Sequence, residues 1–130
     1  MLYYNRCQTK QTIKDYGGAI SDCSKCIELD PDYGMAYYVR GYSKQSVNDF
    51  SGAISDFNKA LNGDLIPYWS DVKNLIKNES YGYLLYYLGL TYVNYSFQSK
   101  KDANFMKRTG CKYLNLADRF GNQNAAINRK

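Results

Sequence analysis

Apolar and small side chains recur at helical spacing through the first half of the chain. In residues 17–29, Ile20, Cys23 and Ile27 fall about one and two turns apart, which places them on one side of an α-helix. Pro31 follows closely, and a proline just past the last periodic residue is typical of a helix end. The same spacing appears in three further segments. The pattern predicts helices over residues 2–13, 17–29, 36–47 and 51–61.

The first half of the chain is an internal duplication. When Met1 is placed on Met35, residues 1–30 align with residues 35–64 without a gap, and 14 of the 30 pairs are identical. Chance would give about two identities at ordinary residue frequencies. Asp15 and Asp49 fall between the two helices of each copy, where Asp favours a reversal of the chain. Each copy is therefore predicted to be a helix hairpin.

The second half carries a more divergent third copy. Residues 83–95 and 110–121 have the features of a first and a second helix. The stretch between them is about nine residues longer than a regular copy allows, so it extends a helix or forms a long polar connection. We expect one domain over residues 1–130, divided into repeat one (1–34), repeat two (35–64), an inserted short helix with Pro67 and Trp69 (65–80), repeat three (81–124) and the start of a capping segment (125–130).

The spacing of the two copies, together with their content, resembles the tetratricopeptide repeat. The residues that carry the resemblance are Tyr37, Arg40, Gly41, Asp49, Phe50, Ala53, Ile54, Phe57, Ala60 and Leu61, with Ile27 to Pro31 in the first copy. Cys7 and Cys26 stand where the family usually has Gly and Ala. The resemblance implies an all-α fold, a right-handed superhelix of three helix-turn-helix repeats, with a concave groove lined by the first helix of each repeat.

The resemblance also implies a function. In this family the groove holds a peptide segment of a partner, so we expect a non-catalytic protein-protein interaction scaffold with a protein or peptide partner. None of the expected groove residues is charged, and Tyr is a favoured contact residue. They are Tyr4, Gln8, Gln11, Thr12, Tyr38, Tyr42, Gln45, Ser46, Tyr83, Tyr86, Leu90, Val93 and Asn94.

The same resemblance predicts what the groove does not bind. Family members that hold the acidic tails of heat-shock chaperones place Lys, Asn and Arg at fixed groove positions. Those positions carry Tyr4, Gln8, Val39, Tyr83 and Tyr87 in this chain. We therefore expect no carboxylate clamp.

Composition argues against catalysis. The chain has no histidine, which removes Ser-His-Asp and Cys-His catalysis and every histidine-containing metal site. Asp15, Asp22, Asp49 and Asp56 recur once per repeat as turn residues and helix-face charges, whereas paired-carboxylate catalysis needs two acids that converge in a cleft. We expect no enzyme activity, no cofactor and no metal.

Cysteines and tyrosines are first explained by packing. Cys23 and Cys26 lie in the middle of a predicted helix, where nothing lowers a thiol pKa, so they fit a core. Cys7 can come near Cys23 across the helix pair, which would allow a disulfide in an oxidising compartment. Trp69 either pins the inserted helix or contacts a partner. Four tyrosines are expected to pack between helices: Tyr3, Tyr37, Tyr92 and Tyr113.

Two alternatives to peptide binding stay open. One is self-association, since repeat arrays with uncapped ends expose apolar edges and stack. The other is weak nucleic-acid binding through the basic residues 100–112, which hold the densest positive cluster of the chain, with Phe105 and Tyr113 as possible stacking partners; the net charge is +5. Residues 81–97 come closest to a membrane span but include many tyrosines, and residues 1–10 show no signal peptide. A cytoplasmic location is expected.

Overall fold

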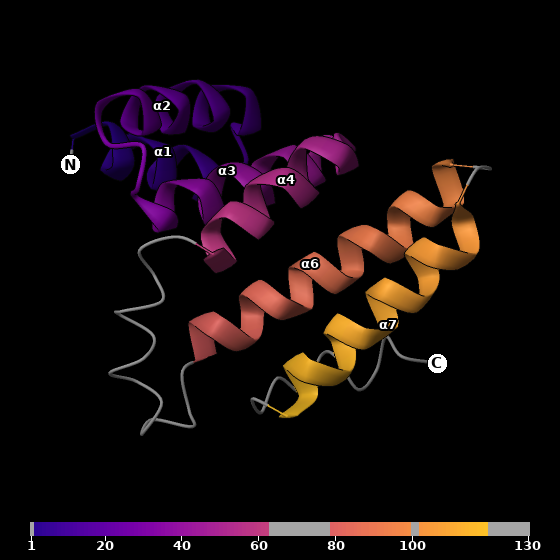
Figure 1. Ribbon diagram of the computed structural model, residues 1–130. Helices are drawn as coiled ribbons and strands as arrows, with labels where there is room; N and C mark the ends of the chain where they lie inside the picture. The colour runs from indigo at the N-terminus through magenta and orange to yellow at the C-terminus, as the bar shows by residue number, and fades with distance from the viewer. Residues whose placement is uncertain (1, 63–78, 100–101, 120–130) are drawn as a thin grey trace. The chain divides into compact units, whose positions relative to one another are not determined.

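The computed structural model describes residues 2–62, 79–99 and 102–119, and the regular secondary structure of this part of the chain is α-helical (Figure 1). This confirms the all-α fold class. The predicted helices of both copies are present with only small shifts at their ends. The helices are α1 (Leu2–Thr12), α2 (Tyr16–Leu29), α3 (Gly34–Ser46), α4 (Phe50–Asn62), α6 (Glu79–Gln98) and α7 (Ala103–Arg119).

The chain divides into two compact units, Met1–Pro67 and Tyr68–Lys130. The boundary falls inside the segment predicted to hold the inserted helix. That helix, with Trp69, and the predicted capping segment lie outside the described residues. Each unit is described by itself below.

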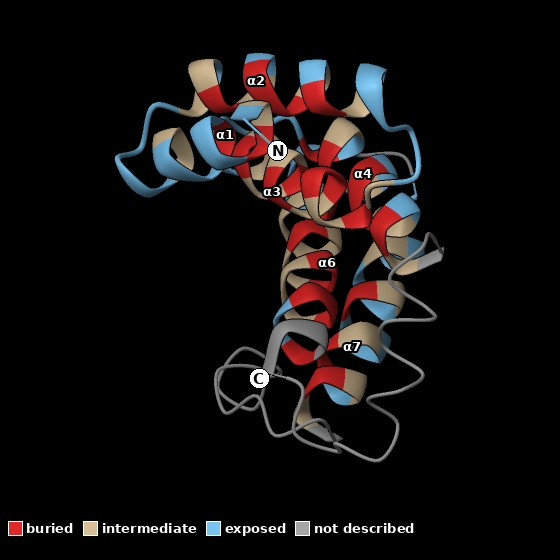
Figure 2. Ribbon diagram, turned by 90° about the vertical axis from the view of Figure 1, so that its left-hand side faces the viewer, coloured by how far each residue is buried: buried red, intermediate tan, exposed pale blue. Residues whose placement is uncertain are grey.

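The first unit consists of two stacked helix hairpins. Helix α1 packs against α2, α3 packs against α4, and α3 also contacts α2 and α1. Buried positions recur at spacings of three and four on α1, α2 and α4, whereas α3, which has three neighbours, is buried on more than one side (Figure 2). Fully buried small residues stand at the helix contacts, including Ala19 on α2, Ala36 on α3 and Ala53 on α4. Small side chains let helix backbones approach closely, so the facing rings and aliphatic chains can interdigitate.

Both hairpins of the first unit use the same turn. Lys14 and Asn48 adopt left-handed backbone conformations with φ near 67° and 66°. The next residue caps the second helix: Asp15 Oδ1 accepts from Gly18 N, and Asp49 Oδ1 from Gly52 N, each at 3.1 Å. A carboxylate in this position satisfies a free N–H of the first helical turn. The prediction that Asp15 and Asp49 are turn residues is confirmed.

The second unit is a longer hairpin in which α6 packs along α7. Leu84, Leu85 and Leu88 of α6 are buried with Leu114 of α7. The two helices approach each other closely at Gly89, where an added Cβ would lie 2.8 Å from Gly110 O. The extra residues of the third copy lengthen both helices, so that α6 ends at Gln98 and α7 begins at Ala103. Of the two predicted alternatives for this stretch, the helical extension is the one observed.

None of the described helices is both long enough and apolar enough to cross a membrane, and this includes the tyrosine-rich α6.

Candidate partner-binding surface

The predicted groove residues of α1 and α3 form one uncharged surface, with Tyr4 as the exception. Gln8 and Thr12 are exposed, as is Ser46, and the others are half-buried. They recur at spacings of three and four, so they share one side of each helix, and α1 contacts α3. We call this set the α1–α3 surface: Gln8, Gln11, Thr12, Tyr38, Tyr42, Gln45 and Ser46.

Tyr4 is a correction to the predicted groove. Only 7% of this residue is exposed, and its ring meets the ring of Tyr33 edge-on with 5.0 Å between centroids. Burial raises the pKa of the Tyr4 hydroxyl, and the nearby Tyr33 and Cys26 raise it further. Tyr4 belongs to the core of the first unit because α1 turns this position towards the junction of α2 and α3. It offers little area to a partner.

Side chains of the α1–α3 surface are held by hydrogen bonds within their own helices and by a ring contact. Thr12 Oγ1 donates to Gln8 O at 2.9 Å, and Ser46 Oγ donates to Tyr42 O at 3.0 Å, so equivalent positions of the two copies behave alike. The ring of Tyr42 lies 6.5 Å from that of Tyr16. These contacts fix the rotamers, and ordered side chains lose less entropy when a partner binds.

The predicted groove residues of the third copy lie on α6. Tyr83 is exposed, whereas Tyr86, Leu90 and Asn94 are half-buried. Tyr87 links the rings, with centroids 6.4 Å from Tyr83 and 5.1 Å from Tyr86. Val93 is placed differently from the prediction, since its side chain lies against Gly110 of α7. The aromatic cluster therefore belongs to the second unit and forms a candidate contact surface of its own.

Two buried carboxylates correct a second prediction. Asp22 and Asp56, expected as helix-face charges, are only 6% and 2% exposed. Asp56 accepts hydrogen bonds from Arg40 Nη2 at 2.7 Å and Nε at 2.8 Å, and Lys44 Nζ lies 3.1 Å away. A bidentate Arg–carboxylate pair is strong and directional. Asp56 thus fixes α4 to α3 from inside the hairpin.

The first hairpin carries the same three charges in looser form. Asp22 Oδ2 lies 2.8 Å from Lys10 Nζ and 3.5 Å from Arg6 Nε. These contacts are ion pairs, and within the described residues Asp22 Oδ2 has no hydrogen bond of good geometry. The three identities between the copies were a visible signal, since Arg and Lys are one turn apart and the Asp falls on the next helix. Each of these charges taken singly predicts a solvated helix face, whereas the three identities together indicate an ion cluster between the two helices.

Arg40 also ties the two hairpins together. Its Nη1 donates to Ser24 Oγ of α2 at 3.1 Å. The hydrogen bond with Asp56 raises the pKa of the Arg40 guanidinium, against the opposing effect of burial. Arg40 therefore sets the position of α3 against α2 and α4 at once. Through α3, it orients half of the α1–α3 surface.

The outer side of α1 is mostly polar. Ala36 and Val39 of α3 are buried against the first hairpin. Their counterparts on α1 are Leu2, which is 68% exposed, and the exposed Asn5. The side of α1 that corresponds to this contact of α3 therefore combines the exposed Leu2 with polar side chains.

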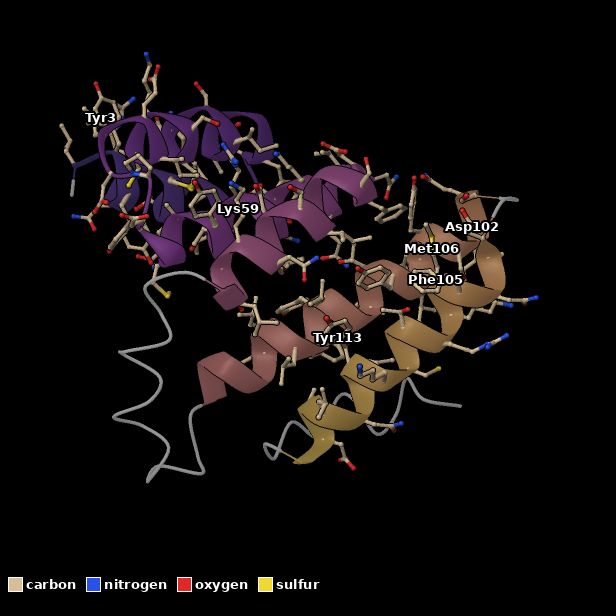
Figure 3. The ribbon with its side chains drawn as sticks, in the orientation of Figure 1. Tyr3, Lys59, Asp102, Phe105, Met106 and Tyr113 are labelled. Carbon is tan, nitrogen blue, oxygen red and sulfur yellow. A yellow bond between two sulfur atoms is a disulfide. The ribbon has the colours of Figure 1, made fainter. Side chains whose placement is uncertain are left out.

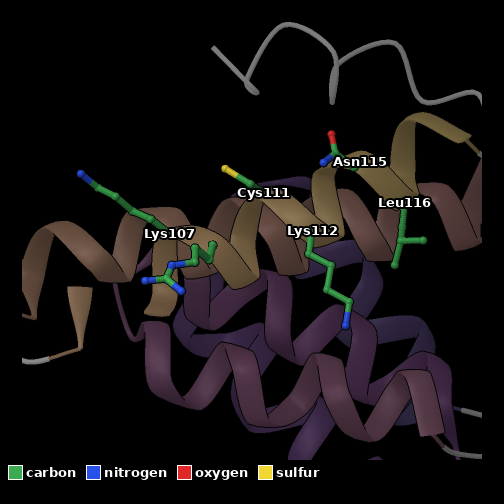
Figure 4. Close-up of a pocket in the computed structure, with 6 residues that line it drawn as sticks. Lys107, Cys111, Lys112, Asn115 and Leu116 are labelled. Atoms are coloured by element: carbon green, nitrogen blue, oxygen red, sulfur yellow. The ribbon is translucent and has the colours of Figure 1, made fainter. Parts of the chain in front are cut away.

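Helix α7 presents a basic face. Lys107, Arg108 and Lys112 line a shallow hollow together with Cys111, Asn115 and Leu116 (Figure 4). Phe105 is exposed, but Tyr113 is stacked on Tyr92 of α6 with 5.9 Å between centroids (Figure 3). Tyr113 thus packs between helices as predicted. Of the two rings considered for stacking on a nucleobase, only that of Phe105 remains exposed.

The cysteines of the first hairpin lie in the core, as predicted for Cys23 and Cys26. Cys7 and Cys23 form a disulfide with 5.3 Å between their Cα atoms, while Cys26 and Cys111 are free thiols. Burial raises the pKa of the Cys26 thiol. Tyr37 is also buried as expected, and Tyr3 is half-buried. Among the residues that the structure describes, no three Cys, Asp or Glu side chains cluster closely enough to hold a metal ion.

Comparison with known proteins gives no match for this chain. No protein-family model matches the chain. No curated protein gives a match either. The fold defines an all-helical protein with a duplicated helix hairpin, and its function has to be argued from the surfaces described above.

Proposed function

We propose that this protein is a non-catalytic interaction module of the tetratricopeptide type. It binds a peptide segment of a partner protein on the first helices of its hairpins. The proposal keeps the right-handed superhelix implied by the sequence resemblance as part of the hypothesis.

The observation that carries the proposal is the structural equivalence of the two copies. At aligned positions they share the turn conformation, the Asp cap and an Arg–Lys–Asp set whose carboxylate is buried. A hairpin that repeats in this way stacks on its neighbour and leaves the first helices side by side. Fold alone does not define function, so the surface on those helices has to support it.

The α1–α3 surface suits an uncharged or mixed peptide. Its amides can donate to and accept from a peptide backbone, and its two tyrosines offer area at low entropic cost. The cations nearest to it are already engaged, because Lys10 and Lys44 pair with Asp22 and Asp56. The lysines of α1 and α3 themselves are therefore both paired, which supports the expectation that this surface has no carboxylate clamp.

A peptide-display selection tests the proposal. Random peptides are selected on the full chain, and the affinity of the enriched peptides is measured by fluorescence anisotropy. The test variant is Gln8→Glu with Gln45→Glu, which changes charge but hardly changes shape. We expect affinity to fall at least about tenfold, since unpaired carboxylates replace amides at the contact.

The matched control is Ser21→Glu with Ser55→Glu. These serines are exposed on the second helices at equivalent positions, and the charge change is the same. Affinity should change less than about twofold in the control, as expected for sites outside the interface. Equal losses in both double variants, or no enriched peptide at all, would contradict the proposal.

A further inference from the structure

Each described hairpin has a close contact between its two helices. In the second hairpin Gly41 faces Phe57, and a Cβ added at Gly41 would lie 3.0 Å from the Phe57 ring. In the second unit Gly89 faces Leu114. Both hairpins combine a glycine with a large apolar side chain. The first hairpin has the Cys7–Cys23 disulfide at this point, in the positions that the duplication aligns with Gly41 and Phe57.

Besides the ion pairs of Arg6 and Lys10 with Asp22, α1 buries few residues. Its buried residues are Tyr4 and Cys7. The equivalent helix α3 buries Gly34, Ala36, Tyr37, Val39, Gly41 and Ser43. A helix of 11 residues is marginal in water without tertiary contacts. One of the two buried residues of α1, Cys7, is thus part of the disulfide.

We propose that the Cys7–Cys23 disulfide is a redox-controlled clamp that holds α1 on α2, and that its reduction releases α1. The reductant is a dithiol. Its two sulfurs deliver two electrons and two protons, the Sγ–Sγ bond breaks to give two thiols, and the dithiol closes to its own disulfide. Both cysteines are fully buried, so reduction proceeds when the hairpin opens transiently.

The reduced contact is weaker than its counterpart in the second hairpin. Two separate thiol side chains replace a single covalent bridge, and no ring fills the space as Phe57 does. The chain also regains the freedom that the closed loop between Cys7 and Cys23 had removed. Release of α1 takes Tyr4 away from Tyr33 and Cys26 and uncovers that part of the core. This consequence does not depend on which partner the protein binds.

Hydrogen exchange on the full chain tests the clamp. Amide exchange is followed for α1, α3 and α4 before and after treatment with dithiothreitol, and alkylation followed by mass measurement counts the thiols. After reduction, protection in α1 should fall by up to about 100-fold, the order expected for opening a loop of this length. Protection in α3 and α4 should change by less than about threefold. The alkylated Cys26 fraction should rise with α1 exchange.

Two double variants sharpen the test. Cys7→Gly with Cys23→Phe transfers the packing of the second hairpin into the first, and its α1 protection should not respond to dithiothreitol. Cys7→Ser with Cys23→Ser should resemble the reduced protein. If the Cys7→Gly, Cys23→Phe variant does not fold, the proposal is decided by the reduced wild-type protein and the Cys7→Ser, Cys23→Ser variant. The clamp is ruled out if alkylation counts two additional thiols after reduction but the amide protection of α1 changes by less than about twofold. It is also ruled out if the isolated protein already has four free thiols and α1 is nevertheless protected.

Discussion

The two hairpins of the first unit share their sequence pattern but differ in how they are anchored. Both place Arg, Lys and Asp in the same positions, yet the Arg6 side chain is 50% exposed and the Arg40 side chain 18%. The difference comes from the neighbours. Helix α3 lies against α2 as well as α4, and Ser24 of α2 supplies an acceptor for Arg40. The same charges therefore stabilise a buried contact in one hairpin and a half-solvated one in the other.

The two hairpins also differ in how their helices are joined at this equivalent contact. The second hairpin uses shape, with Gly41 under the ring of Phe57. The first uses a covalent bond between Cys7 and Cys23. The packing of Gly41 against Phe57 does not depend on redox conditions, whereas the Cys7–Cys23 disulfide does. Two nearly identical hairpins are thus expected to respond differently to the same perturbations.

The largest difference is expected on removal of the buried carboxylates. Asp56→Ala leaves Arg40 and Lys44 without their partner and should cost about 3–5 kcal/mol of unfolding free energy. Asp22→Ala leaves Arg6 and Lys10 with access to water, so it should cost roughly 1 kcal/mol. Urea denaturation followed by circular dichroism measures both. Exposed Asp32→Ala is the control and should stay within about 0.5 kcal/mol of wild type. Equal losses for Asp22 and Asp56 would remove the distinction between the hairpins.

The next effect concerns the closest contact of the second hairpin. Gly41→Ala puts a Cβ 3.0 Å from Phe57 and 3.2 Å from Asp56 Cβ, so the fully packed site is overfilled. We expect a loss of about 1–3 kcal/mol. Gly17→Ala is the matched control, since nothing lies within 4 Å of its added Cβ and alanine favours the helix. The control should leave stability unchanged or raise it by up to about 1 kcal/mol. A stabilising Gly41→Ala would mean that the two helices separate easily.

The helical caps should behave alike in both hairpins. Asp15→Ala and Asp49→Ala each remove one side-chain acceptor of equal geometry, so each should cost about 1 kcal/mol. Asp15→Asn and Asp49→Asn keep the acceptor and should retain most of the stability. The measurement is the urea midpoint of each variant. A cap effect confined to one hairpin would show that the turns are not equivalent in energy, although they are equivalent in geometry.

The hairpins, their turns and their caps could be predicted because these features depend on local sequence. The internal duplication defines the helix pairs, and Asp after a left-handed residue defines the turn. The burial of Asp22, Asp56 and Tyr4 could not be predicted in the same way. Helical spacing tells which residues share a side, but the neighbour that covers that side comes from the stacking of hairpins. The lengths of α6 and α7 were left open for a related reason, because the polar stretch between the predicted helices contains no proline to end either helix.

The smallest expected effect is a dependence of stability on pH, and it arises in the first hairpin. It is negligible near neutral pH and grows at alkaline pH. Burial raises the pKa values of Tyr4, Tyr33 and Cys26 above their ordinary values of 10.0, 10.0 and 9.0. A group that holds its proton more tightly when folded adds stability that is complete below its unfolded pKa. That stability is lost as the pH rises through the folded pKa, because the unfolded chain then binds fewer protons. We therefore expect the urea midpoint of the oxidised protein to be constant to about pH 8.5 and to fall above about pH 9–10.

Substitution separates this cluster from general alkaline unfolding. Tyr33→Phe removes one titrating hydroxyl but keeps the ring against Tyr4, so the alkaline fall should become shallower. Cys111→Ser changes an exposed thiol of the other unit and serves as the control. Identical alkaline slopes for wild type, Tyr33→Phe and Cys111→Ser would place the sensitivity outside the first hairpin. A shallower slope in Tyr33→Phe alone would locate it at the contact that holds α1, where the second hairpin has Ala60 in place of the Cys26 thiol.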